Sequence, residues 1–173
     1  MTFTSDSAST RFSGALNYSN QTIDTVTSTI AVFKALSIDD QLAVLWYAYT
    51  EMGKSITPAA TGAARLQLAE GLLNQIKQMS HAEQLEAMRD LAGQKNTQVS
   101  RSYGIFSANT KLAFWYELAE LMAKGFVVPV PPGYQISRDG AQVLQTLKEL
   151  DFGQQITVFR KVVTDMGVDP LAD

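Results

Sequence analysis

Two apolar stripes, each with a Trp-Tyr pair at its centre, constrain this chain more than any other feature. The segment 107–126 repeats apolar residues at spacings of three and four, namely Leu112, Trp115, Tyr116, Ala119, Met122 and Phe126. The segment 40–54 repeats the pattern with Leu42, Leu45, Trp46, Tyr49 and Met52. This spacing is typical of one helix face. Either stripe alone fits an ordinary packed core. Two large aromatic faces pack poorly in one core, so together they predict a flat ligand between them, such as a polyene or a planar ring.

Capping residues divide most of the chain into helices. Ser37, Ser107 and Ser137 are candidate N-caps, and Ser80 with Glu83 and Asp151 with Gln154 have the spacing of capping boxes. We predict helices over 23–36, 40–54, 58–79, 81–93, 107–126, 137–150 and from 151 onward, with a short helix within 95–106. Gly125 is the expected stop of the 107–126 helix. No segment alternates apolar and polar residues as a β-strand does, so the predicted fold is all-α.

Three segments depart from this regular pattern. Residues 1–22 are rich in Ser, Thr and Asn and predict an N-terminal arm laid across the body, followed by a single helical domain over 23–173. The run 127–134 contains three prolines and predicts a rigid, extended connection, because proline cannot continue a helix. Gly62 and Gly71 interrupt the 58–79 helix at a cost in stability, which predicts close approach by a neighbouring element.

Composition excludes several classes of protein. The chain is 46% hydrophobic and 18% charged, which indicates a globular rather than a disordered protein. Its formal charge of -3 argues against nucleic acid as a partner. It has no cysteine, no apolar run of membrane length and no basic-then-apolar leader. These features predict a soluble, untargeted protein that is not an integral membrane protein. The absence of cysteine leaves the compartment open, and the location that we expect is cytoplasmic.

Residues with catalytic potential are few. His81 is the one histidine, just inside a predicted helix start, and we expect it to be a solvated surface residue. One histidine without cysteine cannot make the usual zinc motifs, and no phosphate loop, dinucleotide fingerprint or nucleophile elbow is present. Glu51, Glu117 and Glu120 lie near the aromatic stripes, where solvated or paired helix-face carboxylates are expected. The residues therefore predict that the chain is not an enzyme and has neither catalytic nor metal-binding residues.

Four runs of sequence carry a family resemblance. They are, in order, QLAVLWYAYTEMGKSIT, NTKLAFWYELAELMAKG, VVPVPPGY and GQQITVFRKVVTDMG. Together they resemble the N-terminal domain of the orange carotenoid protein, and the likeness extends from about residue 3 to residue 167. Because the chain stops at Asp173, it is most similar to the stand-alone helical carotenoid proteins. The resemblance implies two interleaved four-helix bundles with a keto-carotenoid running between them, of the canthaxanthin, echinenone or hydroxyechinenone type.

The resemblance also implies a set of carotenoid-contacting residues. In the family, the positions of Tyr49 and Trp115 sandwich one terminal ring of the pigment. Ala113 and Ala119 stand where the family often has glycine, and Leu66 replaces a methionine, which predicts a narrower tunnel. The full set of matching positions is Leu42, Trp46, Tyr49, Met79, Met88, Asn109, Leu112, Trp115, Tyr116, Met122, Val130 and Arg160.

Two functions follow from the resemblance. The first is photoprotection, in which a non-photoswitching protein uses its pigment to quench singlet oxygen physically. The alternative is an effector that docks on the phycobilisome and drains its excitation, for which Arg160 matches a family residue involved in docking.

A separate homologue of the C-terminal domain is the expected carotenoid donor, and the expected location is near the thylakoid membranes of a photosynthetic bacterium. The remaining hypothesis is a helical protein that binds another apolar ligand.

Overall fold

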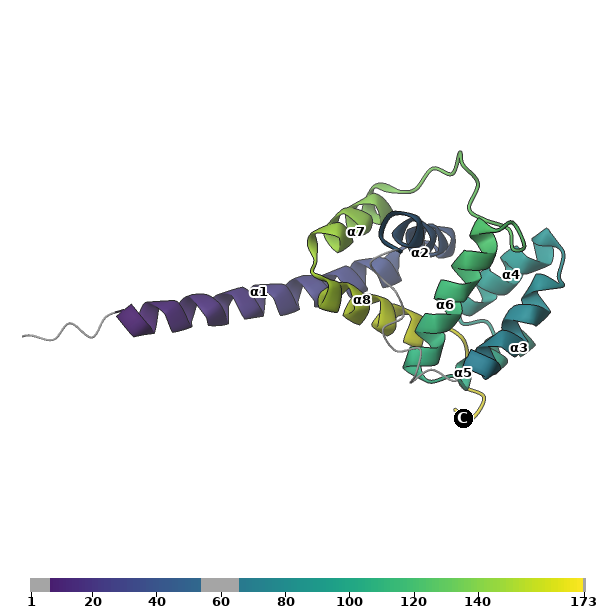
Figure 1. The fold of residues 1–173 in the computed structure, drawn as a ribbon, viewed down its shortest axis with the longest axis horizontal. Coiled ribbons are helices and arrows are strands. Elements are labelled where there is room, and N and C mark those ends of the chain that lie inside the picture. Colours follow the sequence, from purple (N-terminus) through teal and green to yellow (C-terminus); the bar gives the residue numbers. More distant parts are fainter. Residues whose placement is uncertain (1–6, 54–65, 173) are drawn as a thin grey trace, which may run out of the picture.

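The computed structural model describes residues 7–53 and 66–172, and these ranges hold eight helices and no strand (Figure 1). The all-α prediction is confirmed. No helix in these ranges is long and apolar enough to cross a membrane. The helices are α1 (Ser7–Ala35), α2 (Ile38–Met52), α3 (Leu66–Lys77), α4 (His81–Ala92), α5 (Gln98–Gly104), α6 (Ala108–Ala123), α7 (Arg138–Glu149) and α8 (Phe152–Thr164).

The helices form two bundles. The first contains α1, α2, α7 and α8, and the second contains α3, α4, α5 and α6 (Figure 1). The first bundle is therefore built from both ends of the chain, with the second inserted between them, so the predicted interleaving is confirmed. Helix α6 packs on α8, and α2 packs on α4 and α6. These contacts join the two bundles.

The predicted N-caps are confirmed. The side chains of Ser37, Ser80, Ser107, Ser137 and Asp151 each accept a hydrogen bond from the backbone N–H three residues later. Both predicted capping boxes are formed as well. At the other end of α6, Gly125 adopts φ +82° and lets the N–H of Phe126 reach the carbonyl of Leu121 over 2.9 Å.

Buried glutamines orient consecutive helices in a way that the sequence analysis did not predict. Gln41, Gln84 and Gln155 each follow the capping motif by one residue. Their amides donate to carbonyls at the end of the preceding helix: Gln41 to Leu36 (3.2 Å), Gln84 to Ile76 (3.2 Å) and Gln155 to Leu147 (2.9 Å). Each glutamine side chain thereby connects the start of one helix to the end of the helix before it, and so fixes the corner between the two helices.

Lys111 occupies the same position in α6 and makes a longer-range tie. Its Nζ donates to the carbonyl of Thr164 at the end of α8 over 2.8 Å. Burial lowers the pKa of this amine, whereas the charges of Asp165 and Asp169 act in the opposite direction. A cation at a helix C-terminus is favourable. Lys111 therefore fixes α6 of the second bundle to α8 of the first.

Three local predictions are corrected. Helix α1 begins at Ser7 and passes through residue 22 without a break, because residues 15–35 contain neither glycine nor proline. Its first turns extend away from the bundles and do not lie across them (Figure 1). Gly71 marks no close approach, since a Cβ there would meet nothing within 4 Å. Phe126 lies beyond the end of α6 and is exposed, with Lys77 Nζ 4.2 Å from its ring centroid. The predicted helix start at Thr57 and Pro58, and Gly62, lie outside the described residues.

Candidate functional site

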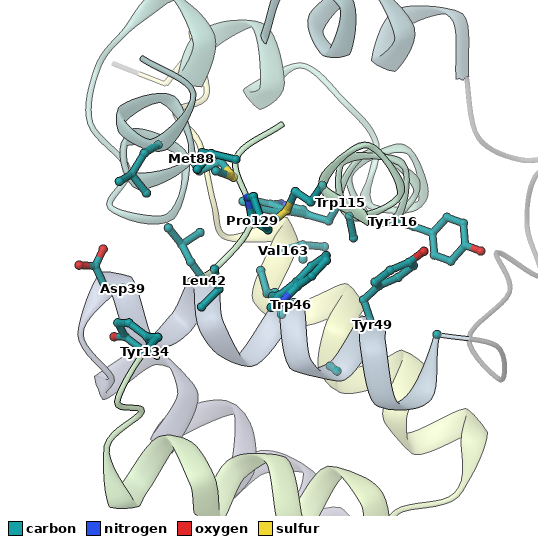
Figure 2. A pocket seen from close by; sticks show the side chains of 18 of the residues that line it. Asp39, Leu42, Trp46, Tyr49, Met88, Trp115, Tyr116, Pro129, Tyr134 and Val163 are labelled. Carbon is teal, nitrogen blue, oxygen red and sulfur yellow. The ribbon is translucent and has the colours of Figure 1, made fainter. Parts of the chain in front are cut away.

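A cavity of about 240 Å³ lies between the two bundles (Figure 2). Helices α2 and α8 of the first bundle and α4 and α6 of the second supply its walls, and the connection between α6 and α7 closes a further side. Both predicted aromatic stripes therefore face the same space. Most lining side chains are aliphatic or aromatic, which suits an apolar ligand.

The structure brings most of the predicted site residues together. Those that line the cavity are Leu42, Trp46, Tyr49, Met88, Leu112, Trp115, Tyr116, Met122 and Val130. Met79, Asn109 and Arg160 do not line it. Met79 follows α3 and packs against the core, and Asn109 lies half-buried in the first turn of α6. On α8 the cavity-facing residues are Phe159 and Val163, one turn apart, so the adjacent Arg160 lies on a different face.

Thirteen other residues line the cavity and are not among the predicted pigment-contacting positions. Helical periodicity could have found several, since Leu45 and Ala119 belong to the stripes and Leu85 is one turn before Met88. No local signal marked the polar pair of Asp39 and Arg89. The complete set is Asp39, Leu45, Ala48, Gly53, Leu85, Arg89, Ala119, Val128, Pro129, Pro131, Tyr134, Phe159 and Val163.

Trp115 is held rigidly in the cavity wall. Its indole Nε1 donates to the hydroxyl of Tyr103 over 3.0 Å, and that hydroxyl donates to the carbonyl of Val163 over 2.5 Å. Tyr103 is fully buried, and burial raises the pKa of its phenol well above the ordinary value. Phe114 meets the Trp115 ring edge-on, with centroids 5.8 Å apart. Partners from α5, α6 and α8 thus fix the orientation of the indole.

One end of the cavity is aromatic (Figure 2). Tyr49 stacks on Trp46 with ring centroids 5.9 Å apart and meets Tyr116 edge-on at 5.7 Å. Its hydroxyl donates to Glu120 Oε1 over 2.5 Å. Burial and this hydrogen bond raise the pKa of Tyr49 to about 12, and burial with the charge of Glu120 also raises the pKa of Tyr116. Both phenols are therefore neutral at physiological pH.

The three carboxylates near the stripes have different surroundings. Glu120 is paired with Tyr49, as described above, and Glu51 forms an ion pair with Lys148 across α2 and α7. Glu117 is exposed. His81 is also exposed, as predicted. None of these side chains lines the cavity. No group of three or more His, Cys, Asp or Glu side chains in the described ranges could hold a metal ion.

The opposite end of the cavity is charged (Figure 2). Arg89 on α4 donates from Nε to Asp39 Oδ1 over 2.8 Å and from Nη2 to Asp39 Oδ2 over 3.1 Å. Asp39 lies in the first turn of α2, so this bidentate pair ties the two bundles together. Nearby, the hydroxyl of Tyr134 donates to Asp40 Oδ1 over 2.7 Å. Burial and this hydrogen bond raise the pKa of Tyr134 to about 12.

The proline connection is anchored at both of its ends. The N–H of Val128 donates to Gln84 Oε1 over 2.9 Å, while Gln84 Nε2 donates to the carbonyl of Phe126 over 3.0 Å. Tyr134 fixes the far end through Asp40. Between these anchors, Pro129, Val130 and Pro131 line the cavity. The connection is non-helical, as its prolines predicted, and it forms a wall of the site that is held at both ends.

The burial pattern suits a rod-shaped ligand. Leu42, Met88 and Met122 in the wall are buried, whereas Asp39 and Tyr116 at the two ends are partly exposed. A buried apolar wall between two partly exposed ends suits an elongated apolar ligand. The residues present thus fit a carotenoid in their chemistry.

Comparison with known proteins agrees with this geometry. Residues 19–169 match the family model described as orange carotenoid protein, N-terminal. An orange carotenoid-binding domain-containing protein of Nostoc sp. (strain PCC 7120) is 83% identical over 173 residues, the full length of both chains. Among solved structures, the orange carotenoid protein of Anabaena (Nostoc) sp. PCC 7120 binding canthaxanthin is 52% identical, with a TM-score of 0.78 over 85% of this chain and 48% of that chain.

A shorter structure matches over nearly its whole length. The Red Carotenoid Protein of Anabaena (Nostoc) sp. PCC 7120 binding canthaxanthin is 40% identical, with a TM-score of 0.73 over 84% of this chain and 99% of that chain. The chain spans about half the length of two curated orange carotenoid-binding proteins, 52% and 51%. With the family model covering most of its length and with the same two-bundle architecture, this chain belongs to the orange carotenoid protein N-terminal domain family.

Proposed function

We propose that this chain holds a keto-carotenoid between its two bundles and uses it to quench singlet oxygen. The observation that carries the proposal is the apolar, aromatic-walled cavity between α2, α4, α6 and α8 in a member of this family. Two relatives whose structures have been solved are described as binding canthaxanthin, which supports a keto-carotenoid as the ligand.

The protein's part in this function is to bind and orient. Burial of an apolar rod is worth on the order of 25 cal/mol per Å² of area removed from water. The rings of Trp115 and Tyr49 offer stacking surfaces, and Met88 and Met122 adapt to an irregular outline. The bound polyene would supply a low-lying triplet state that accepts energy from singlet oxygen and loses it as heat. No bond is made or broken, so the proposal needs no catalytic residue.

Singlet-oxygen phosphorescence tests this function. The protein is produced with canthaxanthin, and its quenching rate is compared with that of the same chain without pigment. The pigment-loaded protein is expected to shorten the phosphorescence lifetime in proportion to its concentration, and the unloaded chain is expected to have a much smaller effect. Equal quenching by the two forms would contradict the proposal, because the effect would then come from the polypeptide alone.

A second candidate function is docking on the phycobilisome, for which Arg160 provides the observation. Its Nε is buried without a hydrogen-bond partner, and the ion pairs among the described residues do not include Arg160. A half-buried, uncompensated guanidinium suits contact with an acidic partner surface. Phycobilisome fluorescence with the pigment-loaded protein added tests this role. A drop in fluorescence that Arg160→Leu abolishes would support docking, and unchanged fluorescence with the wild-type chain would contradict it.

Carotenoid delivery is a related part of the proposal. The expected donor is a separate homologue of the C-terminal domain of the orange carotenoid protein. Mixing such a pigment-loaded homologue with this chain, and then separating the two by size, should move the colour to this chain. Colour that stays with the donor would argue against this route.

A further inference from the structure

The two ends of the cavity differ in what they offer a ligand (Figure 2). Asp39, Arg89 and Tyr134 belong to one end, and Tyr49 and Tyr116 belong to the other. A linear carotenoid has a ring at each end, and these rings differ among carotenoids in whether they carry oxygen. Which ring occupies which end therefore depends on the hydrogen-bond donors available at each.

At the aromatic end, the phenolic proton of Tyr49 is already engaged. The Tyr49 hydroxyl donates to Glu120 Oε1 over 2.5 Å, and burial together with the charge of the same carboxylate raises the pKa of Tyr116. A phenol has one O–H, so a proton given to Glu120 is not available to a ligand. This end presents ring faces and edges, which favour an apolar terminal ring.

At the charged end, Arg89 retains donors. A guanidinium has five N–H groups. The hydrogen bonds among the described residues use three of them, two to Asp39 and one to Glu86 at 2.8 Å. Arg89 is also the one cation among the described residues that line the cavity. Tyr134, its neighbour at this end, gives its proton to Asp40.

The position of Arg89 is fixed by its partners. The bidentate contact with Asp39 holds the planar guanidinium in one orientation, which lowers the entropy cost of a further hydrogen bond. A carbonyl oxygen accepts hydrogen bonds and donates none, and so complements a group that only donates.

We infer that the cavity is directional: Arg89 donates a hydrogen bond to an oxygen on one terminal ring of the carotenoid, and the ring at the Tyr49 end is held by aromatic contact. This inference rests on the proposed function. It assigns Arg89 as a residue that selects a keto- or hydroxyl-bearing ring. A carotenoid with a single oxygenated ring is bound in one orientation, with that ring beside Arg89.

The test uses echinenone, which has one keto ring, and β-carotene, which has none. The infrared carbonyl stretch of echinenone in the wild-type protein should lie below its position in an apolar solvent, because a hydrogen bond weakens the C=O bond. Arg89→Met should return the band to the apolar-solvent position. Arg101→Met is the matched control, since Arg101 is exposed on α5 and does not line the cavity, and it should leave the band unchanged.

Affinity gives a second readout. Wild-type protein should bind echinenone about two- to tenfold more tightly than β-carotene, the range for one net hydrogen bond, and Arg89→Met should remove that preference. Because Arg89→Met leaves Asp39 without its partner, the double variant Asp39→Asn/Arg89→Met is measured as well. It removes both charges and should behave like Arg89→Met.

Two results would overturn the inference while leaving the proposed function intact. One is echinenone bound to the wild-type protein with its carbonyl band at the apolar-solvent position. The other is a lowered band that persists in the double variant with pigment bound, because the donor would then be another group. A wild-type protein that takes up no carotenoid at all would contradict the proposed function and this inference together.

Discussion

The indole of Trp115 donates to the hydroxyl of Tyr103, which in turn donates to the carbonyl of Val163. This chain of two hydrogen bonds connects α6, α5 and α8, and so fixes an aromatic wall of the cavity to both bundles. Because Tyr103 and Val163 are buried, breaking either hydrogen bond leaves a polar group that water cannot reach to replace the lost partner.

The first prediction concerns this network. Trp115→Ala should lower the free energy of unfolding by about 3–5 kcal/mol, because it removes a buried ring and the cavity collapses only in part. Trp115→Phe keeps most of the ring and loses the donor, and should cost about 1 kcal/mol. Urea unfolding of the pigment-free chain measures both. If the two variants lost equal free energy of unfolding, the buried volume of the indole would contribute nothing to stability, which would contradict this prediction.

A second prediction concerns acid stability through Asp40. Burial would raise the pKa of this carboxyl, but hydrogen bonds from Ser137 and Tyr134 outweigh it and lower the pKa. A lowered pKa in the folded state stabilises the protein above the unfolded pKa of about 3.9, and this stability is lost as the pH falls through the folded value. Asp40→Asn should cost about 1–3 kcal/mol at pH 7 and flatten the pH dependence below about pH 4.

Unfolding measured from pH 7 to pH 2.5 checks the Asp40 prediction. Asp24→Asn is the matched control, because Asp24 is exposed on α1 and should not change the pH dependence. If Asp40→Asn kept the full wild-type slope below pH 4, the buried carboxylate would not be a source of acid sensitivity.

A third prediction contrasts two glycines. Gly71 is in the interior of α3 with open space around it, so Gly71→Ala should stabilise the chain by about 0.5–1 kcal/mol. Gly104 ends α5, where an added Cβ would lie 1.8 Å from the carbonyl oxygen of Val168. Gly104→Ala must therefore displace the C-terminal segment and should cost about 2 kcal/mol or more. Thermal unfolding of both variants should move in opposite directions, and a shift of the same sign would contradict the packing described here.

A fourth prediction concerns light. A photoswitch needs two states whose balance light can bias. In the described residues, two side-chain contacts tie α2 to the second bundle, one at each end of the cavity. They are the ion pair of Asp39 with Arg89 and the hydrogen bond from Tyr49 to Glu120. We expect these 173 residues with bound keto-carotenoid to give the same absorption spectrum before, during and after strong blue illumination. A reversible shift in this chain alone would be the contrary result.

The sequence predicted the features that depend on near neighbours. N-caps such as Ser80 could be predicted because the capping side chain and the backbone N–H that it accepts from are three residues apart. The two aromatic stripes could be predicted from helical periodicity, which places Trp46 on one helix face with Leu42 and Trp115 on another helix face with Met122. The cavity between the bundles is where these stripes meet.

The features that the sequence did not predict depend on distant partners. Gln84 contacts Phe126 and Val128, and Arg89 contacts Asp39 on a different helix, and no local pattern indicates either contact. Arg160 was expected in the site because of its match to a family position. The structure places it beside, and not among, the cavity-facing residues of α8, since one residue along a helix is a turn of about 100°.

The most direct test of the account is the colour of the protein made in cells that produce canthaxanthin. The wild-type chain should purify with bound pigment and a strong absorption band in the visible. Trp115→Ala and Tyr49→Ala should each retain less pigment, with a shifted band, because each removes an aromatic wall of the cavity. His81→Gln, at an exposed position, should match the wild type in pigment content and spectrum. A colourless wild-type protein, or Trp115 and Tyr49 variants that load canthaxanthin with unchanged yield and spectrum, would contradict the account.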